Sequence, residues 1–258
     1  MKYPVILTGL GLVILSGLFL LLLNHGKPPG DEKAELRVFC AAGFQKPMSE
    51  LAKRYEAETG VRLNLQFGGS GALGSQLRIA GGDLFFPADE GYLESLEDDG
   101  LLESSSAVTT LTAGLVVPKG NPKRVSGLND LWKKGVTVSV AEKSASIGKF
   151  TAEVLADEGV LERIRANIVV TKPTVTGVVS DVAIGAVDVG IAWDVVARNF
   201  SGVAWMSVPE FEKRKKRASI GILKKGRVVE AKKFVAFLMS DAGRIVFEKM
   251  GYRVEGGN

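Results

Sequence analysis

Four short segments of small residues are the parts of this chain best suited to bind a small ligand. Each is rich in glycine, serine or threonine and lies between an apolar run and a helix-like pattern; they are 41–45, 68–72, 144–149 and 174–177. Glycine lets the backbone approach a ligand, and Ser70, Ser146 and Thr176 add hydroxyl donors. A helix start also carries unpaired N–H groups and a partial positive charge. Four such starts facing one point would bind a compact anion without a cationic side chain.

A second interpretation stays open for each segment taken alone. Serine and threonine at the start of a helix are also common N-caps, whose hydroxyls bind the N–H groups of their own helix. The composition shared by all four segments favours one common binding site.

The same residues argue against an enzyme, which we keep as a minor alternative. Segment 68–72 is similar to the nucleophile elbow of hydrolases, but that chemistry needs a base, and the one histidine is His25, beside an N-terminal apolar run. The glycine spacing of 69–74 approaches a P-loop, but Ser75 stands where lysine is required. One histidine and one cysteine, Cys40, do not suit a zinc or haem site. We predict no catalytic residue, no metal-cation site and no cofactor.

Composition is that of an ordinary globular protein. The chain has 258 residues, of which 46% are apolar and 24% charged, enough for one large or two modest domains. Its net charge of +4 is spread along the sequence, a weak argument for nucleic acid. The densest basic run, 213–217, has no interleaved aromatic residues and is interpreted as solvated surface. We therefore predict no nucleic-acid partner.

The N-terminal residues have the pattern of an export or anchor segment. A mostly apolar, uncharged run over 5–23 is nearly long enough, at about 1.5 Å per residue, to cross a bilayer core. Residues 1–25 are therefore a signal peptide or a signal anchor, and the poor cleavage site at 22–26 favours an uncleaved anchor. Residues 26–35, with two prolines and two glycines, are expected to be a linker. We predict a protein of the periplasm or cell surface, anchored to the inner membrane.

The remaining chain alternates short apolar runs with helix-period segments. Met48, Leu51 and Tyr55, for example, share one face of a helix that Gly60 ends. Strands alternating with helices predict an α/β fold with parallel sheets, in which ligands bind at the carboxyl ends of strands. The expected strands are 36–41, 62–67, 84–86, 110–117, 136–140, 168–171, 189–193 and 218–223, and the expected helices are 47–59, 71–80, 91–99, 128–134, 148–158, 176–186, 229–239 and 241–250.

From about residue 35 to 253 the sequence resembles the molybdate-binding proteins of ABC importers, which have the type II periplasmic-binding-protein fold. The resemblance rests on the order and spacing of several motifs. They are VFCAAG at 38–43, the helix and turn at 51–61, FGGSG at 67–71, GDLFFPAD at 82–89, SIGK at 146–149, DVGIAW at 188–193 and the closing pattern at 234–252.

The resemblance implies two α/β lobes with a ligand cleft between them. The first lobe would comprise 36–112 and 206–258, and the second lobe 113–205. Carried over by position, the anion contacts are Gly43, Ser70, Ile147, Val175 and Trp193. Three of them would act through backbone N–H groups, whereas Ser70 would add its hydroxyl. The family usually has serine where Gly43 stands and tyrosine where Trp193 stands. The resemblance therefore predicts the fold more firmly than the affinity or selectivity of the site.

The donor chemistry of the four segments narrows the class of ligand. Molybdate, tungstate and sulfate carry no proton near neutral pH, and no segment contains an aspartate or glutamate that would repel them. Hydrogen phosphate would gain from a carboxylate, and Asp194 is the one acid near enough to provide it. None of the four tyrosines lies in these segments, which argues against an iron site. The preference for molybdate or tungstate over sulfate rests on the resemblance alone.

The predicted function is that of an extracytoplasmic substrate-binding protein of an ABC importer, which captures molybdate or tungstate by neutral hydrogen bonds. Its partners would be the oxyanion, an ABC permease and, through the N-terminal segment, the membrane, and we expect a monomer. Two alternatives stay open. One is a binding protein for sulfate or phosphate, and the other is a membrane-anchored sensor or scaffold on the same fold.

Overall fold

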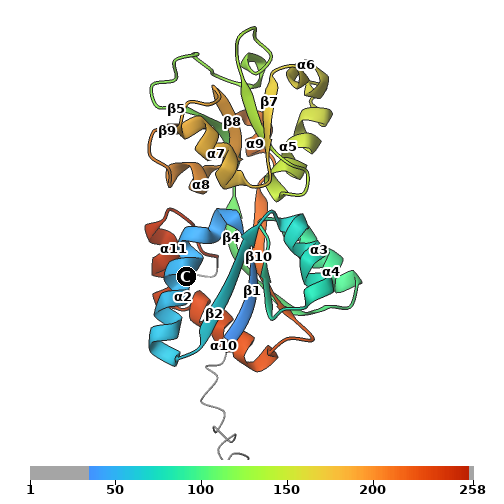
Figure 1. Cartoon of the computed structure of the whole chain (residues 1–258), viewed down its shortest axis with the longest axis vertical. Coiled ribbons are helices and arrows are strands. Elements are labelled where there is room, and N and C mark those ends of the chain that lie inside the picture. Colours follow the sequence, from blue (N-terminus) through green and yellow to red (C-terminus); the bar gives the residue numbers. More distant parts are fainter. Residues whose placement is uncertain (1–34, 256–258) are drawn as a thin grey trace, which may run out of the picture. The chain divides into compact units, whose positions relative to one another are not determined.

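The computed structural model of the protein describes residues 35–255 of the 258-residue chain. The predicted signal or anchor segment and almost all of the predicted linker lie outside the described residues. No helix within 35–255 has both the length and the hydrophobicity that crossing a bilayer requires. The described residues form the two-lobed α/β body of Figure 1.

Each lobe is built around one five-stranded sheet (Figure 1), and we call the sheets with their helices the first and the second lobe. The first sheet has the order β2-β1-β3-β10-β4, and the second has the order β7-β6-β8-β5-β9. The first sheet consists of β1 (Glu35–Ala41), β2 (Arg62–Gly68), β3 (Leu84–Phe86), β4 (Leu102–Leu111) and β10 (Lys216–Leu223). The second consists of β5 (Ala113–Pro118), β6 (Val138–Ala141), β7 (Ile168–Lys172), β8 (Val189–Trp193) and β9 (Val203–Met206).

Helices flank both sheets (Figure 1). Those of the first lobe are α2 (Gln45–Thr59), α3 (Ser70–Ala80), α4 (Gly91–Asp98), α10 (Val228–Met239), α11 (Asp241–Lys249) and the short 3-10 helix η1 (Ala42–Phe44). Those of the second lobe are α5 (Ser146–Asp157), α6 (Leu161–Arg165), α7 (Val175–Ala183), α8 (Asp194–Arg198), α9 (Pro209–Glu212) and the 3-10 helix η2 (Leu128–Asp130). The predicted two-lobed α/β fold is confirmed.

Both sheets are mixed, although alternation of strands and helices predicts parallel ones. Strand β1 runs parallel to β2 and β3, but β10 runs antiparallel to β3 and β4. In the second sheet β6 is parallel to β7 and β8, and β5 is antiparallel to β8 and β9. The cause is the path of the chain, which passes to the second lobe between Leu111 and Ala113 and returns between Glu212 and Lys216. Strands β5 and β10 each begin at the side of their sheet that faces the other lobe. Because β8 and β3 end at that side, β5 runs antiparallel to β8 and β10 runs antiparallel to β3.

Further elements differ from the sequence prediction, which lacks the short helices α6, α8 and α9. The strands β4 and β9 are mostly absent from it, and both lie at sheet edges, where half-exposed strands lack a strong apolar pattern. The helix expected over 128–134 is only the single 3-10 turn η2. There the carboxylate of Asp130 accepts hydrogen bonds from the backbone N–H and the hydroxyl of Ser126, at 2.5 and 2.9 Å, and this side-chain pairing forms a compact turn.

An aromatic cluster holds the start of α2 in the first lobe. The rings of Phe44 and Phe86 stack with centroids 4.1 Å apart, and Tyr252 packs against Phe44 at 5.6 Å and against Phe247 at 5.5 Å. All four side chains are buried. Aromatic contacts of this kind stabilise by about 0.5–1.5 kcal/mol beyond their buried area. The cluster therefore gives the segment after β1 a rigid support.

Candidate ligand site

The four glycine- and serine-rich segments meet at one small cavity between the two lobes. Its volume is about 10 Å³, which is roughly the room of one water-sized group. The first lobe contributes the lining residues Ala41, Ala42, Gly43, Gly68, Gly69, Ser70 and Ala88. The second lobe contributes Ala145, Ser146, Ile147, Thr174, Val175 and Trp193. All five residues predicted from the resemblance thus line the same cavity.

Three long helices begin at the cavity wall. Helix α3 starts at Ser70, α5 at Ser146 and α7 at Val175, and in each case the capping residue before it also lines the cavity. The first N–H groups of a helix have no acceptor within that helix. Each helix start also carries a partial positive charge. The cavity wall thus provides unpaired donors and positive potential without any cationic side chain.

The hydroxyls at these helix starts do not share one role. Thr174 caps α7 by accepting a hydrogen bond from Gly177 N–H at 3.2 Å, so the alternative of a common N-cap holds there. Thr176 pairs with the Thr174 hydroxyl at 3.0 Å and does not line the small cavity. Neither Ser70 nor Ser146 caps a helix. The two serines therefore differ from ordinary capping residues.

Ser70 is oriented as a donor. Its side chain is buried, with 1% exposure, and its Oγ accepts a hydrogen bond from Ala88 N–H at 3.1 Å. Because the oxygen already accepts this bond, the hydroxyl proton is available to an acceptor in the cavity. The turn after β3 thus orients a side chain at the start of α3.

No ionisable side chain lines the cavity. Two acids adjoin lining residues in sequence, Asp89 after Ala88 and Asp194 after Trp193. The carboxylate of Asp89 pairs with Lys216 Nζ at 2.9 Å, and Asp194 turns toward the passage between the lobes. Its carboxylate accepts a hydrogen bond from Thr112 N–H at 3.3 Å, and its own N–H donates to Thr112 carbonyl oxygen at 2.9 Å. Within residues 35–255 no group of three or more His, Cys, Asp or Glu residues is placed to hold a metal ion. The lining offers donors to an anion and no carboxylate that would repel it.

Glycines let the two lobes meet at the cavity. Gly71 N–H donates a hydrogen bond to Ser144 carbonyl oxygen across the cleft, at 2.8 Å. A side-chain Cβ at Gly69 would lie 2.9 Å from Pro173 carbonyl oxygen and 3.1 Å from that of Ser144. Only glycine therefore fits position 69 while the lobes are in this closed arrangement.

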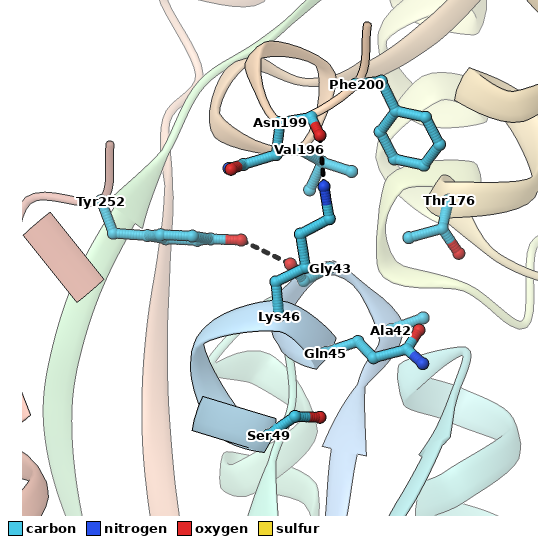
Figure 2. Close-up of a pocket in the computed structure, with 10 residues that line it drawn as sticks. All are labelled: Ala42, Gly43, Gln45, Lys46, Ser49, Thr176, Val196, Asn199, Phe200 and Tyr252. Atoms are coloured by element: carbon cyan, nitrogen blue, oxygen red, sulfur yellow. Dashed lines mark hydrogen bonds between the residues drawn. The ribbon is translucent and has the colours of Figure 1, made fainter. Parts of the chain in front are cut away.

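A larger pocket adjoins the small cavity and shares Ala42 and Gly43 with it. Its volume is about 370 Å³, and its other lining residues are Gln45, Lys46, Ser49, Thr176, Val196, Asn199, Phe200 and Tyr252. Figure 2 shows two hydrogen bonds at its edge, from Lys46 Nζ to Asn199 carbonyl oxygen and from the Tyr252 hydroxyl to Gly43 carbonyl oxygen. The first joins the lobes, and the second fixes the segment after β1.

Tyr252 is suited to this fixing role. Burial is the main cause that raises the pKa of Tyr252 well above its ordinary value, so its hydroxyl remains protonated as a donor. The tyrosine stands near the C-terminal end of the chain, more than 200 residues after Gly43, and sequence spacing gives no indication of this contact.

Comparison with known proteins identifies the family. Residues 36–253 match the family described as bacterial extracellular solute-binding protein. The chain belongs to this family. The molybdate-binding protein ModA of Mycobacterium tuberculosis is 30% identical over 229 residues, which cover 87% of this chain and 86% of that protein. A putative ABC transporter substrate-binding lipoprotein of Bacillus subtilis, YvgL, is 29% identical over 238 residues, covering 90% and 91%.

Solved structures agree with this assignment. The periplasmic molybdate-binding protein of Azotobacter vinelandii has a TM-score of 0.70 at 22% identity, covering 86% of this chain and 100% of that one. At this identity the match shows the fold. Family and fold together make this chain an extracytoplasmic solute-binding protein.

Two positions of this solute-binding protein depart from the usual pattern of the family it resembles. A Cβ at Gly43 would lie 3.2 Å from Val196 Cγ2 and 3.6 Å from Val175 Cγ1, so a serine would crowd the facing lobe. Trp193 ends β8 with 1% exposure, and its ring centroid lies 5.4 Å from that of Phe150. The larger indole and the smaller glycine both line the small cavity.

Proposed function

We propose that this protein captures molybdate or tungstate between its lobes as the substrate-binding protein of an ABC importer. The observation that carries the proposal is the small neutral cavity at the starts of α3, α5 and α7. A compact tetrahedral dianion needs many donors and no neighbouring carboxylate, and this lining has both features. Because the cavity has room for about one water-sized group in this arrangement, the lobes must lie slightly further apart around the anion. The molybdate-binding relatives support the choice of ligand.

In this account the anion holds the two lobes together. The N–H of Ile147 and Val175 belong to the second lobe, whereas Gly43 N–H and the Ser70 hydroxyl belong to the first. A ligand that binds both sides favours the closed arrangement by its extra affinity for that state. The closed protein would then deliver the anion to a membrane permease, with residues 1–25 as the membrane attachment and the protein acting as a monomer.

Direct binding tests the proposal. The full chain, purified in mild detergent, is titrated by calorimetry with molybdate, tungstate, sulfate and phosphate under identical conditions. The proposal predicts tight binding of molybdate and tungstate and at least tenfold weaker binding of phosphate. Preferential binding of sulfate would keep the site and change the substrate. The absence of binding by all four anions would contradict the oxyanion site and favour the sensor or scaffold.

A further inference from the structure

One buried hydroxyl at the cavity has no hydrogen-bond partner. Within residues 35–255 four buried polar side-chain atoms lack one, and they are Thr109 Oγ1, Ser146 Oγ, Thr151 Oγ1 and Trp205 Nε1. Of these four residues, only Ser146 lines the small cavity. Its side chain is 3% exposed. A buried hydroxyl without a partner costs about 1–3 kcal/mol.

The position of Ser146 at the start of a helix makes the lack of a hydrogen-bond partner unusual. Serine at a helix start normally caps the helix by accepting a backbone N–H. Helix α5 begins at Ser146 after Ala145, and no side chain caps it. The Ser146 hydroxyl is thus neither a cap nor paired with another side chain. The capping role that explains Thr174 does not apply here.

No acceptor at the cavity wall pairs with this hydroxyl. No carboxylate lines it, and the Oγ of Ser70, the other serine at the wall, accepts its hydrogen bond from Ala88 N–H. A ligand with acceptor oxygens would satisfy both hydroxyls at once. Ser70 belongs to the first lobe and Ser146 to the second, so one anion would receive an O–H donor from each side.

We infer that Ser146 is a ligand-binding residue of this protein, whose hydroxyl donates a hydrogen bond to an oxygen of the bound tetrahedral oxyanion. The inference rests on the proposed function and deepens it. It adds one donor from the second lobe to the five residues predicted by resemblance. Because Gly43 offers no hydroxyl, Ser70 and Ser146 would provide the O–H donors, whereas the third hydroxyl at the wall, that of Thr174, caps α7 and pairs with Thr176.

The test compares two hydroxyls of the same helix. Sodium molybdate is titrated by calorimetry into the full chain and into its Ser146→Ala, Ser146→Cys and Thr151→Val variants. Thr151 is a matched control, since it is 4% exposed, belongs to α5 and also lacks a partner but lies outside the cavity. Cysteine keeps the size of serine with a weak donor, and valine keeps the shape of threonine.

We expect Ser146→Ala to weaken molybdate binding about 10- to 100-fold, since it removes a hydrogen bond to a charged group. Ser146→Cys should weaken it in the same direction, and Thr151→Val should leave the affinity within about twofold. Without ligand, Ser146→Ala should melt no lower than the parent, because it removes an unpaired buried hydroxyl.

Each outcome decides one question. Parent-like affinity in both folded Ser146 variants would overturn the inference and leave the proposed function intact. Equal loss in Ser146→Ala and Thr151→Val would also overturn it, since a general effect on α5 would then be the cause. Failure of the parent chain to bind molybdate would overturn the proposed function, and the inference with it.

Discussion

The backbone N–H of Gly71 in the first lobe donates a 2.8 Å hydrogen bond to the carbonyl oxygen of Ser144 in the second lobe. This bond joins two of the glycine- and serine-rich segments directly beside the small cavity. It requires the two backbones to approach without intervening side chains. The closed arrangement therefore depends on glycines in the first lobe.

Replacing Gly69 by alanine should impair closure and ligand binding. The new Cβ would lie 2.9 Å from Pro173 carbonyl oxygen, a backbone atom that cannot move aside easily. We expect molybdate affinity to fall at least tenfold in a calorimetric titration. The control is Gly74→Ala on α3, where a Cβ has no neighbour closer than 3.6 Å. That variant should keep its affinity and gain about 0.5–1 kcal/mol of stability. An equal loss of molybdate affinity in Gly69→Ala and Gly74→Ala would contradict the idea that the close contact at Gly69 allows the lobes to close.

Removing the Ser70 hydroxyl should weaken binding and destabilise the first lobe. Ser70→Ala loses the proposed donor to the anion and leaves Ala88 N–H without its acceptor. The first loss should lower molybdate affinity about 10- to 100-fold, and the second should cost about 1–3 kcal/mol in urea unfolding of the ligand-free protein. A variant with unchanged affinity would remove Ser70 from the site, whatever its stability.

The substitution Tyr252→Phe tests whether the Tyr252 hydroxyl holds the segment after β1 in place. It removes the hydroxyl that donates to Gly43 carbonyl oxygen but keeps the packed ring. We expect a loss of about 1 kcal/mol in the free energy of unfolding and a several-fold weaker affinity for molybdate. Tyr55→Phe is the control, because Tyr55 packs on Phe234 in the first lobe and does not line either pocket. If Tyr252→Phe binds molybdate with the same affinity as Tyr55→Phe, the hydroxyl of Tyr252 does not order the ligand site.

Acid should weaken the turn at η2 through one carboxylate. The hydrogen bond from Lys133, followed by that from Ser126 N–H, lowers the pKa of Asp130 from 3.8 to about 2. Its folded-state pKa is depressed, so its stabilisation is present above about pH 4 and is lost as the pH falls toward 2. Asp130→Asn should cost about 1 kcal/mol at pH 7, and its deficit should shrink below pH 4. Urea unfolding at pH 7, 4 and 3 measures this, and a constant deficit would exclude the carboxylate as the cause.

The sequence predicts the fold well because each lobe repeats strong local patterns. Buried runs such as β1 and β8, followed by helix-period segments, leave few alternatives to an α/β fold. The weak points are edge strands such as β4, whose exposed serines resemble a loop. The orientation of β5 and β10 was not predictable from local pattern either, since it follows from passages of the chain between lobes.

The candidate site was predictable in its segments but not in its hydroxyls. Strand ends bring the four segments together, as expected for such sheets. Composition alone does not distinguish Ser146, which caps nothing, from Thr174, which caps α7. It also misplaces Thr176, which pairs with Thr174 and lines the larger pocket. These differences depend on side-chain directions that short segments do not encode.

A crystal structure with tungstate, located by its anomalous scattering, tests the central claim most directly. We predict one strong peak in the small cavity, placed so that the tungstate oxygens around it lie within hydrogen-bond distance of Ser70 Oγ and of the N–H groups of Ile147 and Val175. A tungsten peak elsewhere on the chain, or an empty cavity at saturating tungstate, would contradict it.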